Sequence, residues 1–158
     1  MSKTEDKKAA PRNAATNRRA KFDYEIVEKF EAGIELSGGE VKSLRDGGAA
    51  LVDSYAMERK GQLFLVGVHI KPYDKVGYDR PDPYRDRRLL MHRKQIDKIV
   101  GTVSVKGMTI IPMRIYFNER GWAKVEIGLA KAKKQYDKRD TIKKRDEERE
   151  LARDYKTR

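Results

Sequence analysis

Alternation between apolar and charged side chains near the start of the chain limits the fold more than any other feature. Apolar side chains fall on even-numbered positions from 22 to 36, at Phe22, Tyr24, Ile26, Phe30, Ile34 and Leu36. Most odd positions between them carry charged residues. A period of two places one side of a strand in a core and the other in water. The pattern predicts one long strand, and a strand of this length needs a bend, which we expect at Ala32-Gly33.

Patterns along the rest of the chain predict further elements. Gly47-Gly48 ends a short helix, and Lys60-Gly61 connects the two strands of a hairpin. Apolar residues spaced three and four apart, at Ile96, Ile99, Val100 and Val103, indicate a second helix. In chain order, the predicted elements are a short helix at 40–45, strands at 51–59 and 62–71, a loop rich in Pro and Tyr at 72–86, a helix at 87–105, and a second hairpin of strands at 109–117 and 122–130.

These elements predict a mainly β fold with helices. We expect about six antiparallel strands in an OB-fold-like β-barrel, with two to three flanking helices, because short strands with hairpin and bulge signals favour closed sheets. An SH3-like barrel is the alternative. The expected organisation is a disordered N-terminal arm at 1–16, a barrel at 17–132, and a basic C-terminal tail at 133–158.

The positive charge of the chain is concentrated at its two ends. The net charge is +12. Residues 1–21 carry seven Lys or Arg against two Asp or Glu, and residues 131–158 carry twelve against seven. The intervening residues are nearly neutral, with eighteen against sixteen. Basic ends indicate nucleic acid, an anionic membrane, or a solubilising tail, and a predicted strand that continues into a basic tail favours RNA.

Several function classes are disfavoured by what the sequence contains. No apolar run is long enough to span a bilayer, and residues 1–21 lack the apolar segment of a signal peptide. There is no Cys, which excludes disulfides and thiolate catalysis. We therefore expect a cytoplasmic protein. His69 and His92 lie in no nucleophile motif, and Glu31 and Glu35 are more simply solvated carboxylates than a magnesium site. The sequence predicts no enzyme, no metal and no cofactor.

Four basic clusters, two of them beside aromatic residues, are the candidate RNA contacts, because Lys and Arg bind phosphates and aromatic rings stack on bases. Each has a structural alternative: Tyr24 is expected to pack in the core, and Leu89 and Leu90 are as easily core residues as surface ones. The clusters are Asn17, Arg18, Arg19 and Lys21 with Phe22 and Tyr24; Lys42 and Arg45; Arg85, Arg87, Arg88, Arg93 and Lys94 around Leu89, Leu90 and Met91; and Lys124, Lys131, Lys133, Lys134, Lys138 and Arg139 with Trp122 and Tyr136.

The tail contains residues compatible with a helix but no apolar stripe. Gly and Pro are absent from 131–158, and Asp140 and Lys144 form a favourable i,i+4 pair. Without an apolar stripe, an isolated helix is marginal. We expect the tail to be disordered alone and to fold on a partner. In the folded tail, the candidates for phosphate contact are Lys143, Lys144, Arg145, Arg149 and Arg153.

Five segments in this order resemble one known family: NRRAKFDYEIVEKFEAGIEL, GGEVKSLR, DSYA, RLLMHRKQI and RIYFNERGWAKVEIGLAKAKKQYDKR. Together they resemble the SmpB family, the SsrA-binding proteins of bacterial trans-translation. The resemblance covers residues 17–139. Two positions depart from the family pattern: Ala132 stands where the family usually has Gly, and Tyr136 stands where His or Tyr is common.

The resemblance implies a monomeric, non-enzymatic OB-fold protein that binds the tRNA-like domain of tmRNA and delivers it to stalled ribosomes. It implies that the tail, helical on the ribosome, occupies the decoding centre of 16S rRNA and the empty mRNA channel. The implied RNA-binding residues are Asn17, Arg19, Lys21, Tyr24, Glu31, Glu40, Lys42, Arg45, Leu90, Met91, Arg93, Trp122, Lys124, Lys131, Lys133 and Lys134. The implied tail contacts begin with Tyr136, Asp137, Lys138 and Arg139.

Two other readings remain open at this stage. The first is a general OB-fold or ribosomal-type protein that binds structured RNA without preference for a tRNA-like shape. The second is a metal-dependent RNA-processing enzyme, which would require Mg²⁺-dependent cleavage of RNA.

Overall fold

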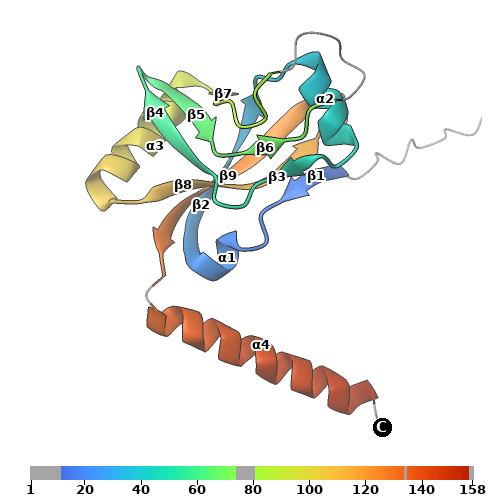
Figure 1. The fold of residues 1–158 in the computed structure, drawn as a ribbon. Coiled ribbons are helices and arrows are strands. Elements are labelled where there is room, and N and C mark those ends of the chain that lie inside the picture. The colour runs from blue at the N-terminus through green and yellow to red at the C-terminus, as the bar shows by residue number, and fades with distance from the viewer. Residues whose placement is uncertain (1–11, 74–80, 134, 157–158) are drawn as a thin grey trace, which may run out of the picture.

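Six strands of this computed structural model close into a ring (Figure 1). The structure describes residues 12–73, 81–133 and 135–156. The main sheet has the order β1-β8-β4-β5-β7-β2-β9. An additional pairing between β8 and β9 closes the six strands from β8 to β9 into the ring. The remaining strand, β1, pairs with residues 114–117 at the end of β8. The elements are β1 (Arg12–Thr16), α1 (Ala20–Asp23), β2 (Tyr24–Ile34), α2 (Gly38–Arg45), β3 (Ala49–Ala50), β4 (Tyr55–Arg59), β5 (Gln62–Val66), β6 (His69–Ile70), β7 (Arg87–Leu90), α3 (Arg93–Lys106), β8 (Thr109–Phe117), β9 (Ala123–Ala132) and α4 (Gln135–Lys156).

The predicted long strand is confirmed as β2, but its bend lies elsewhere. The register with β9 shifts between Ile26 and Glu28 rather than at Ala32-Gly33. Ile26 pairs with Ala130, and Phe30 pairs with Ile127. Before the bulge, Ile26 packs in a small cluster outside the ring, whereas Phe30 packs against the main core. One extra residue turns the strand over, so a single period-two pattern in the sequence covers two opposite faces.

The Lys60-Gly61 turn signal is confirmed by the backbone, and α2 begins with a cap that the sequence analysis did not name. Ser37 caps α2, with its hydroxyl accepting from the Glu40 amide while the Glu40 carboxylate accepts from the Ser37 amide. This reciprocal pair satisfies two otherwise free helix donors. At the β4–β5 hairpin, Lys60 and Gly61 have φ of 51° and 76°, the left-handed conformation that a tight hairpin of this kind requires.

Two predictions of local structure are wrong. Residues 87–90 form β7 rather than the start of a helix, and α3 begins only at Arg93. Burial alternates along β7, with Arg87 and Leu89 inside and Leu90 exposed. Residues 12–16, predicted as part of a disordered arm, form β1 by pairing with β8, because β8 offers an edge whose backbone groups need partners. Residues 1–11 lie outside the described part.

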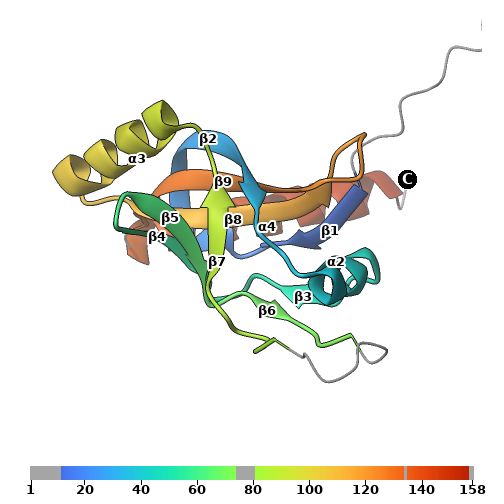
Figure 2. The same ribbon diagram turned by 90° about the horizontal axis from the view of Figure 1, so that it is seen from above.

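The main core fills the ring and is covered at two places by helices. Leu44 of α2 and Ile99 of α3 are fully buried in it, and Figures 1 and 2 show these helices at opposite ends of the barrel. Gly33 allows β7 to lie close to β2, since a Cβ there would come within 3.1 Å of the Leu90 Cβ.

A second, smaller cluster packs α1 onto the outside of the ring. Ala20 lies on Ile111 and Met113 of β8 and on Ala130 of β9, with Tyr24 packed beside them. The Tyr24 ring packs against apolar residues, as expected, but in this smaller cluster rather than in the main core. The cluster also places α1 beside the point where β9 leaves the barrel.

The tail is a single helix, α4, that stands away from the barrel (Figure 1). The sequence analysis expected a disordered segment in the free protein. Its residue types nevertheless suit a helix, because it lacks Gly and Pro and is rich in Glu, Lys and Arg. Among the described residues, no helix combines the length and apolar character needed to cross a membrane.

Candidate nucleic-acid interface

The first basic cluster separates into one structural residue and several exposed ones. Asn17 is buried, and its side-chain amide donates to the Pro112 carbonyl at 3.1 Å. Its side chain is thus tied to the fold, and the RNA contact expected of Asn17 stays a prediction. Arg19 and Lys21 are exposed on α1. These two cations are available to a polyanion at this end of the barrel.

Asp23 connects α1 to the tail, a role that the sequence analysis missed. Its carboxylate lies 3.9 Å from Arg19 and 3.5 Å from Lys138. The only local signal was the i,i+4 spacing from Arg19; the tail partner is more than a hundred residues away. Next to it, Lys133 donates to the Lys21 carbonyl at 2.8 Å and to the Thr141 hydroxyl at 3.3 Å.

The second cluster lies on α2, and both of its cations sit over aromatic rings. Lys42 is 5.5 Å from the ring centre of Tyr73, and Arg45 is 5.6 Å from that of Phe117. Both side chains are exposed. Cation–π contacts orient such side chains without neutralising them, so Lys42 and Arg45 keep their charge for phosphate.

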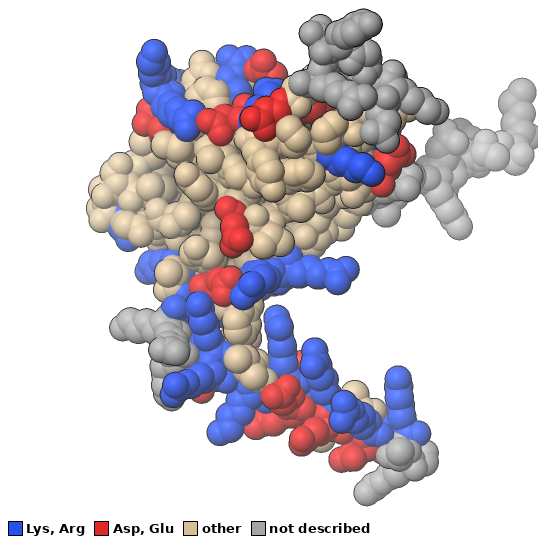
Figure 3. Space-filling view, viewed as in Figure 1, with Lys and Arg blue, Asp and Glu red and all other residues tan. Residues whose placement is uncertain are grey.

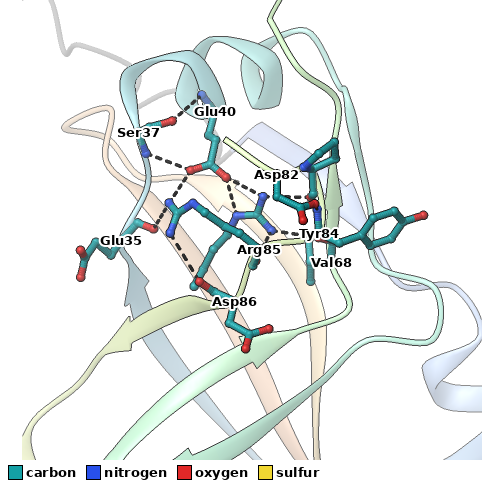
Figure 4. Close-up of polar contacts among 10 residues, drawn as sticks. Glu35, Ser37, Glu40, Val68, Asp82, Tyr84, Arg85 and Asp86 are labelled. Carbon is teal, nitrogen blue, oxygen red and sulfur yellow. Dashed lines mark hydrogen bonds and ion pairs between the residues drawn. The ribbon is translucent and has the colours of Figure 1, made fainter. Parts of the chain in front are cut away.

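Glu40 is a buried residue whose carboxylate pairs within the protein, and the RNA contact expected of it stays a prediction. It is 4% exposed and lies 2.5 Å from both Arg85 and Arg87. Arg87 is fully buried and also donates to the carbonyls of Val68, Pro83 and Arg85. Figure 4 shows this network beneath the first turn of α2. It ties that helix to β7 and to the segment preceding it.

The charges of this network hold both partners ionised. Burial alone would raise the pKa of Glu40, but the hydrogen bond from the Ser37 amide and the two arginines outweigh burial and lower it. Burial lowers the pKa of Arg87, and Glu40 opposes that effect. A buried ion pair with all its hydrogen bonds made is stable, whereas either partner alone would be a buried, uncompensated charge.

Only some residues of the third cluster are exposed, as an RNA-binding surface requires. Leu89 is buried and Leu90 is 48% exposed, which resolves the alternative left open for the pair. Met91 is half-buried and Arg93 exposed. Arg93 donates to the Gly61 carbonyl at 2.9 Å and lies 3.3 Å from Asp97. The apolar tip with one neighbouring cation is therefore present, although the arginines before it pair within the protein.

The fourth cluster lies along β9, with Lys124 on the outer face near its start and Lys131 on the other face at its end. Trp122 is 68% exposed just before the strand, Lys124 is half-buried, and Lys131 is exposed at its end. An exposed indole beside cations suits the stacking of an unpaired base. Lys134 lies outside the described residues.

Glu31 belongs to a network on the same face as Lys124. Its carboxylate accepts from the Tyr116 hydroxyl, and the Arg114 guanidinium lies 4.3 Å from the Tyr116 ring centre. Arg114 also donates to Glu126 at 3.1 Å. Burial and the Glu31 carboxylate raise the pKa of Tyr116. Since Glu31 is exposed, its free oxygen can still accept from an RNA hydroxyl.

The tail cations are displayed along α4. Lys138 is half-buried against Asp23, and the remaining cations predicted as tail contacts are exposed: Arg139, Lys143, Lys144, Arg145, Arg149 and Arg153. The side chains of Tyr136 and Asp137 lie outside the described part. Arg145 also lies 5.7 Å from the Phe22 ring centre, so the helix contacts α1 twice.

Figure 3 shows how these surfaces relate. Lys and Arg gather on the underside of the barrel and along α4, with an open space between them. Such a surface binds phosphates by charge and bases by stacking. Within the described residues, no group of three or more His, Asp or Glu is arranged to hold a metal ion.

Comparison with known proteins identifies the family. The model of the family described as SmpB protein matches residues 14–157. The SsrA-binding protein of Moorella thermoacetica is 54% identical over 87% of this chain and 88% of its own length, and that of Coprothermobacter proteolyticus is 51% identical over 91% and 97%. A solved structure described as "tmRNA-SmpB: a journey to the center of the bacterial ribosome" is 50% identical, covers 76% of this chain and 84% of its own, and superposes with a TM-score of 0.64. The chain belongs to the SmpB family.

Proposed function

We propose that this protein binds the tRNA-like domain of tmRNA and delivers it to stalled ribosomes for trans-translation. The observation that carries the proposal is the extent of the family match, which runs from residue 14 through the barrel to residue 157 in the tail. Relatives at about half identity are named SsrA-binding proteins, and SsrA RNA is tmRNA. The protein acts by binding and performs no chemical step.

The barrel supplies the contacts to tmRNA. Its exposed cations on α1 and α2, its apolar tip at Leu90 and its Trp122 side chain lie at different places on a rigid ring. Structured RNA offers few readable base edges, so recognition rests on the spacing of phosphates and on stacking at unpaired bases. A rigid ring fixes that spacing.

The tail supplies the contact to the ribosome. It carries no packed core of its own and displays its charges on all sides. We propose that it lies in the decoding centre and the empty mRNA channel, where its cations face ribosomal RNA. Two linked anchors multiply affinity through effective concentration. The proposal places the protein in the cytoplasm, as a monomer.

Binding to three RNAs tests the assignment to tmRNA. The dissociation constant of the full chain is measured for the tRNA-like fragment of tmRNA, an ordinary tRNA and a generic hairpin, from about 50 to 200 mM salt. We expect a preference for the tRNA-like fragment that persists as salt rises. Equal binding to all three that weakens together would instead indicate a general OB-fold RNA-binding protein, attracted through counterion release alone.

A further inference from the structure

The carboxylate of Glu31 is unexpected on a surface proposed to bind RNA. Phe30 and Ala32, on either side of it, pack with the main core, so the exposed Glu31 side chain points outward from β2. It lies directly opposite Glu126 of β9, and like charges in that position destabilise a sheet. A carboxylate also repels phosphates, which dominate the affinity of most RNA-binding surfaces. The role of Glu31 is therefore something other than phosphate binding.

A buried tyrosine holds this carboxylate in place. Tyr116 of β8 is only 5% exposed, and its hydroxyl donates to Glu31. The Arg114 guanidinium lies 4.3 Å from the Tyr116 ring centre. Arg114 in turn donates to Glu126 at 3.1 Å and to the Asn13 side chain at 2.9 Å. Residues of β1, β8 and β9 thus fix the position of a hydroxyl that is directed at β2.

The hydrogen bond has one direction, and it leaves part of the carboxylate free. Burial, together with the hydrogen bond to the Glu31 carboxylate, raises the pKa of Tyr116, so its hydroxyl keeps the proton and donates at neutral pH. The bond occupies one carboxylate oxygen, and the exposed side chain leaves the other oxygen to an outside donor. A carboxylate only accepts. The donors that RNA offers are its 2′-hydroxyl groups and the N–H groups of unpaired bases.

We propose that Tyr116 is a positioning residue for RNA recognition: its hydroxyl orients Glu31 so that the free carboxylate oxygen accepts a hydrogen bond from a 2′-hydroxyl or a base N–H. This inference rests on the proposed function and names the chemical group that the outer face of β2 recognises. An unrestrained Glu side chain loses rotamer freedom when it binds, and a carboxylate that is already held loses less. Recognition of this kind adds a preference among RNAs that does not depend on counterion release.

Removal of one hydroxyl from the full chain tests the proposal. Tyr116→Phe keeps the ring beside Arg114 and removes the donor to Glu31. The control is Tyr84→Phe, which removes a hydroxyl from a tyrosine that is 61% exposed and lies against His69. Glu31→Ala and the double variant of Tyr116→Phe with Glu31→Ala complete the set. Affinity for the tRNA-like fragment of tmRNA is measured across a salt series, and urea denaturation establishes that each variant is folded.

The double variant separates positioning from a structural role. Glu31→Ala is expected to weaken binding about tenfold, as does loss of a hydrogen bond to a charged group. Tyr116→Phe is expected to weaken it about threefold, because the carboxylate remains but is no longer held. The dependence on salt should stay as in wild type, since no phosphate contact is lost, and Tyr84→Phe should bind as wild type does. Once Glu31 is absent, Tyr116→Phe should cause no further loss. A loss from Tyr116→Phe that is the same with and without Glu31, or no loss from Tyr116→Phe alone, would overturn the proposal.

A fragment with 2′-deoxynucleotides at its unpaired positions identifies the donor and does not require a change at Tyr116. If Glu31 accepts from a 2′-hydroxyl, wild type should bind this fragment about tenfold more weakly than the RNA, and Glu31→Ala should bind the two alike. If Glu31 accepts from a base, Glu31→Ala should lose about tenfold on both fragments. Binding of both fragments by Glu31→Ala as tightly as by wild type would overturn the proposal. Failure of wild type to prefer the tRNA-like fragment over an ordinary tRNA would overturn the proposed function instead.

Discussion

The barrel and α4 use the same residue type in opposite ways. Arg87 is fully buried and makes hydrogen bonds to one carboxylate and three backbone carbonyls. Arg149 is exposed on a helix with no core beneath it. In the barrel, charge fixes the relation between segments far apart in sequence. In the tail, most charged side chains are exposed, so the net charge of +12 combines buried charges that hold the fold together with charges on an exposed helix.

Removing the tail should produce the largest effect. Truncation after Arg139 deletes most of α4 but leaves the ring and its pairing intact. We expect tagging on stalled ribosomes to be abolished, because the second anchor is lost, and binding to the tRNA-like fragment to remain within about twofold. The measurement is tagging in a reconstituted translation reaction beside fragment binding. If the truncated protein still supports tagging, the tail is not the ribosome contact, and the separate roles proposed for barrel and tail are wrong.

Breaking the buried network should have the next largest effect. Glu40→Ala leaves Arg87 as an uncompensated buried charge, and removing one partner of such a pair costs about 3–5 kcal/mol of unfolding free energy. Urea denaturation followed by tryptophan fluorescence measures this. The control is Glu35→Ala, which breaks the exposed pair with Arg88 and should cost about 0–1 kcal/mol. Similar losses of unfolding free energy in both variants would show that burial of the network does not increase its contribution to stability.

The same network predicts how stability depends on pH. The fold lowers the pKa of Glu40 from 4.5. Its contribution is therefore present above pH 4.5 and is lost as pH falls through the lower value in the folded protein. We expect the urea concentration at the unfolding midpoint of wild type to decrease when the pH is lowered below 4.5. The decrease should be smaller in Glu40→Gln. A parallel loss in both proteins would assign the acid sensitivity to other carboxylates.

The junction between barrel and tail should give the smallest effect. Asp23→Asn removes the ion pairs to Arg19 and Lys138, which are partly exposed and worth less than about 1 kcal/mol. Because the chain has no Cys, Ser104→Cys and Ala152→Cys allow a distance between spin labels on barrel and tail to be measured. We expect a broader distance distribution in Asp23→Asn, with barrel stability unchanged. An unchanged distribution would mean that α1 does not hold the helix.

Local patterns were sufficient for most of the fold. The alternation in β2, the Lys60-Gly61 turn and the second hairpin each depend on neighbours in sequence, and the structure confirms them. The start of α3 was misplaced because the burial of Arg87 depends on Glu40, 47 residues away. Residues 12–16 form a strand only because the edge of β8 is open there. Neither partner can be inferred from the residues themselves.

The candidate contacts show the same limit. Trp122 and Lys131 are exposed because they lie just before and at the end of β9, and Lys124 is half-buried on it; the sequence analysis named all three. Asn17 and Glu40 were named for their positions in family-like motifs, yet both are polar residues whose partners are buried backbone groups or arginines. One sequence alone does not separate a polar residue that holds the fold together from one that binds RNA.

The closure of the ring has a consequence for how the barrel opens. Strands β4 and β8 are paired only at Ala56 and Ile110, whereas β2 and β9 are paired along nearly their whole length. A seam with so few residue pairs opens before a long one, since few backbone hydrogen bonds resist it. Amide protons near Ala56 are therefore the ones we expect to exchange fastest among the ring strands. The β2–β9 pairing, from which the tail continues, is then expected to stay closed while the β4–β8 seam opens.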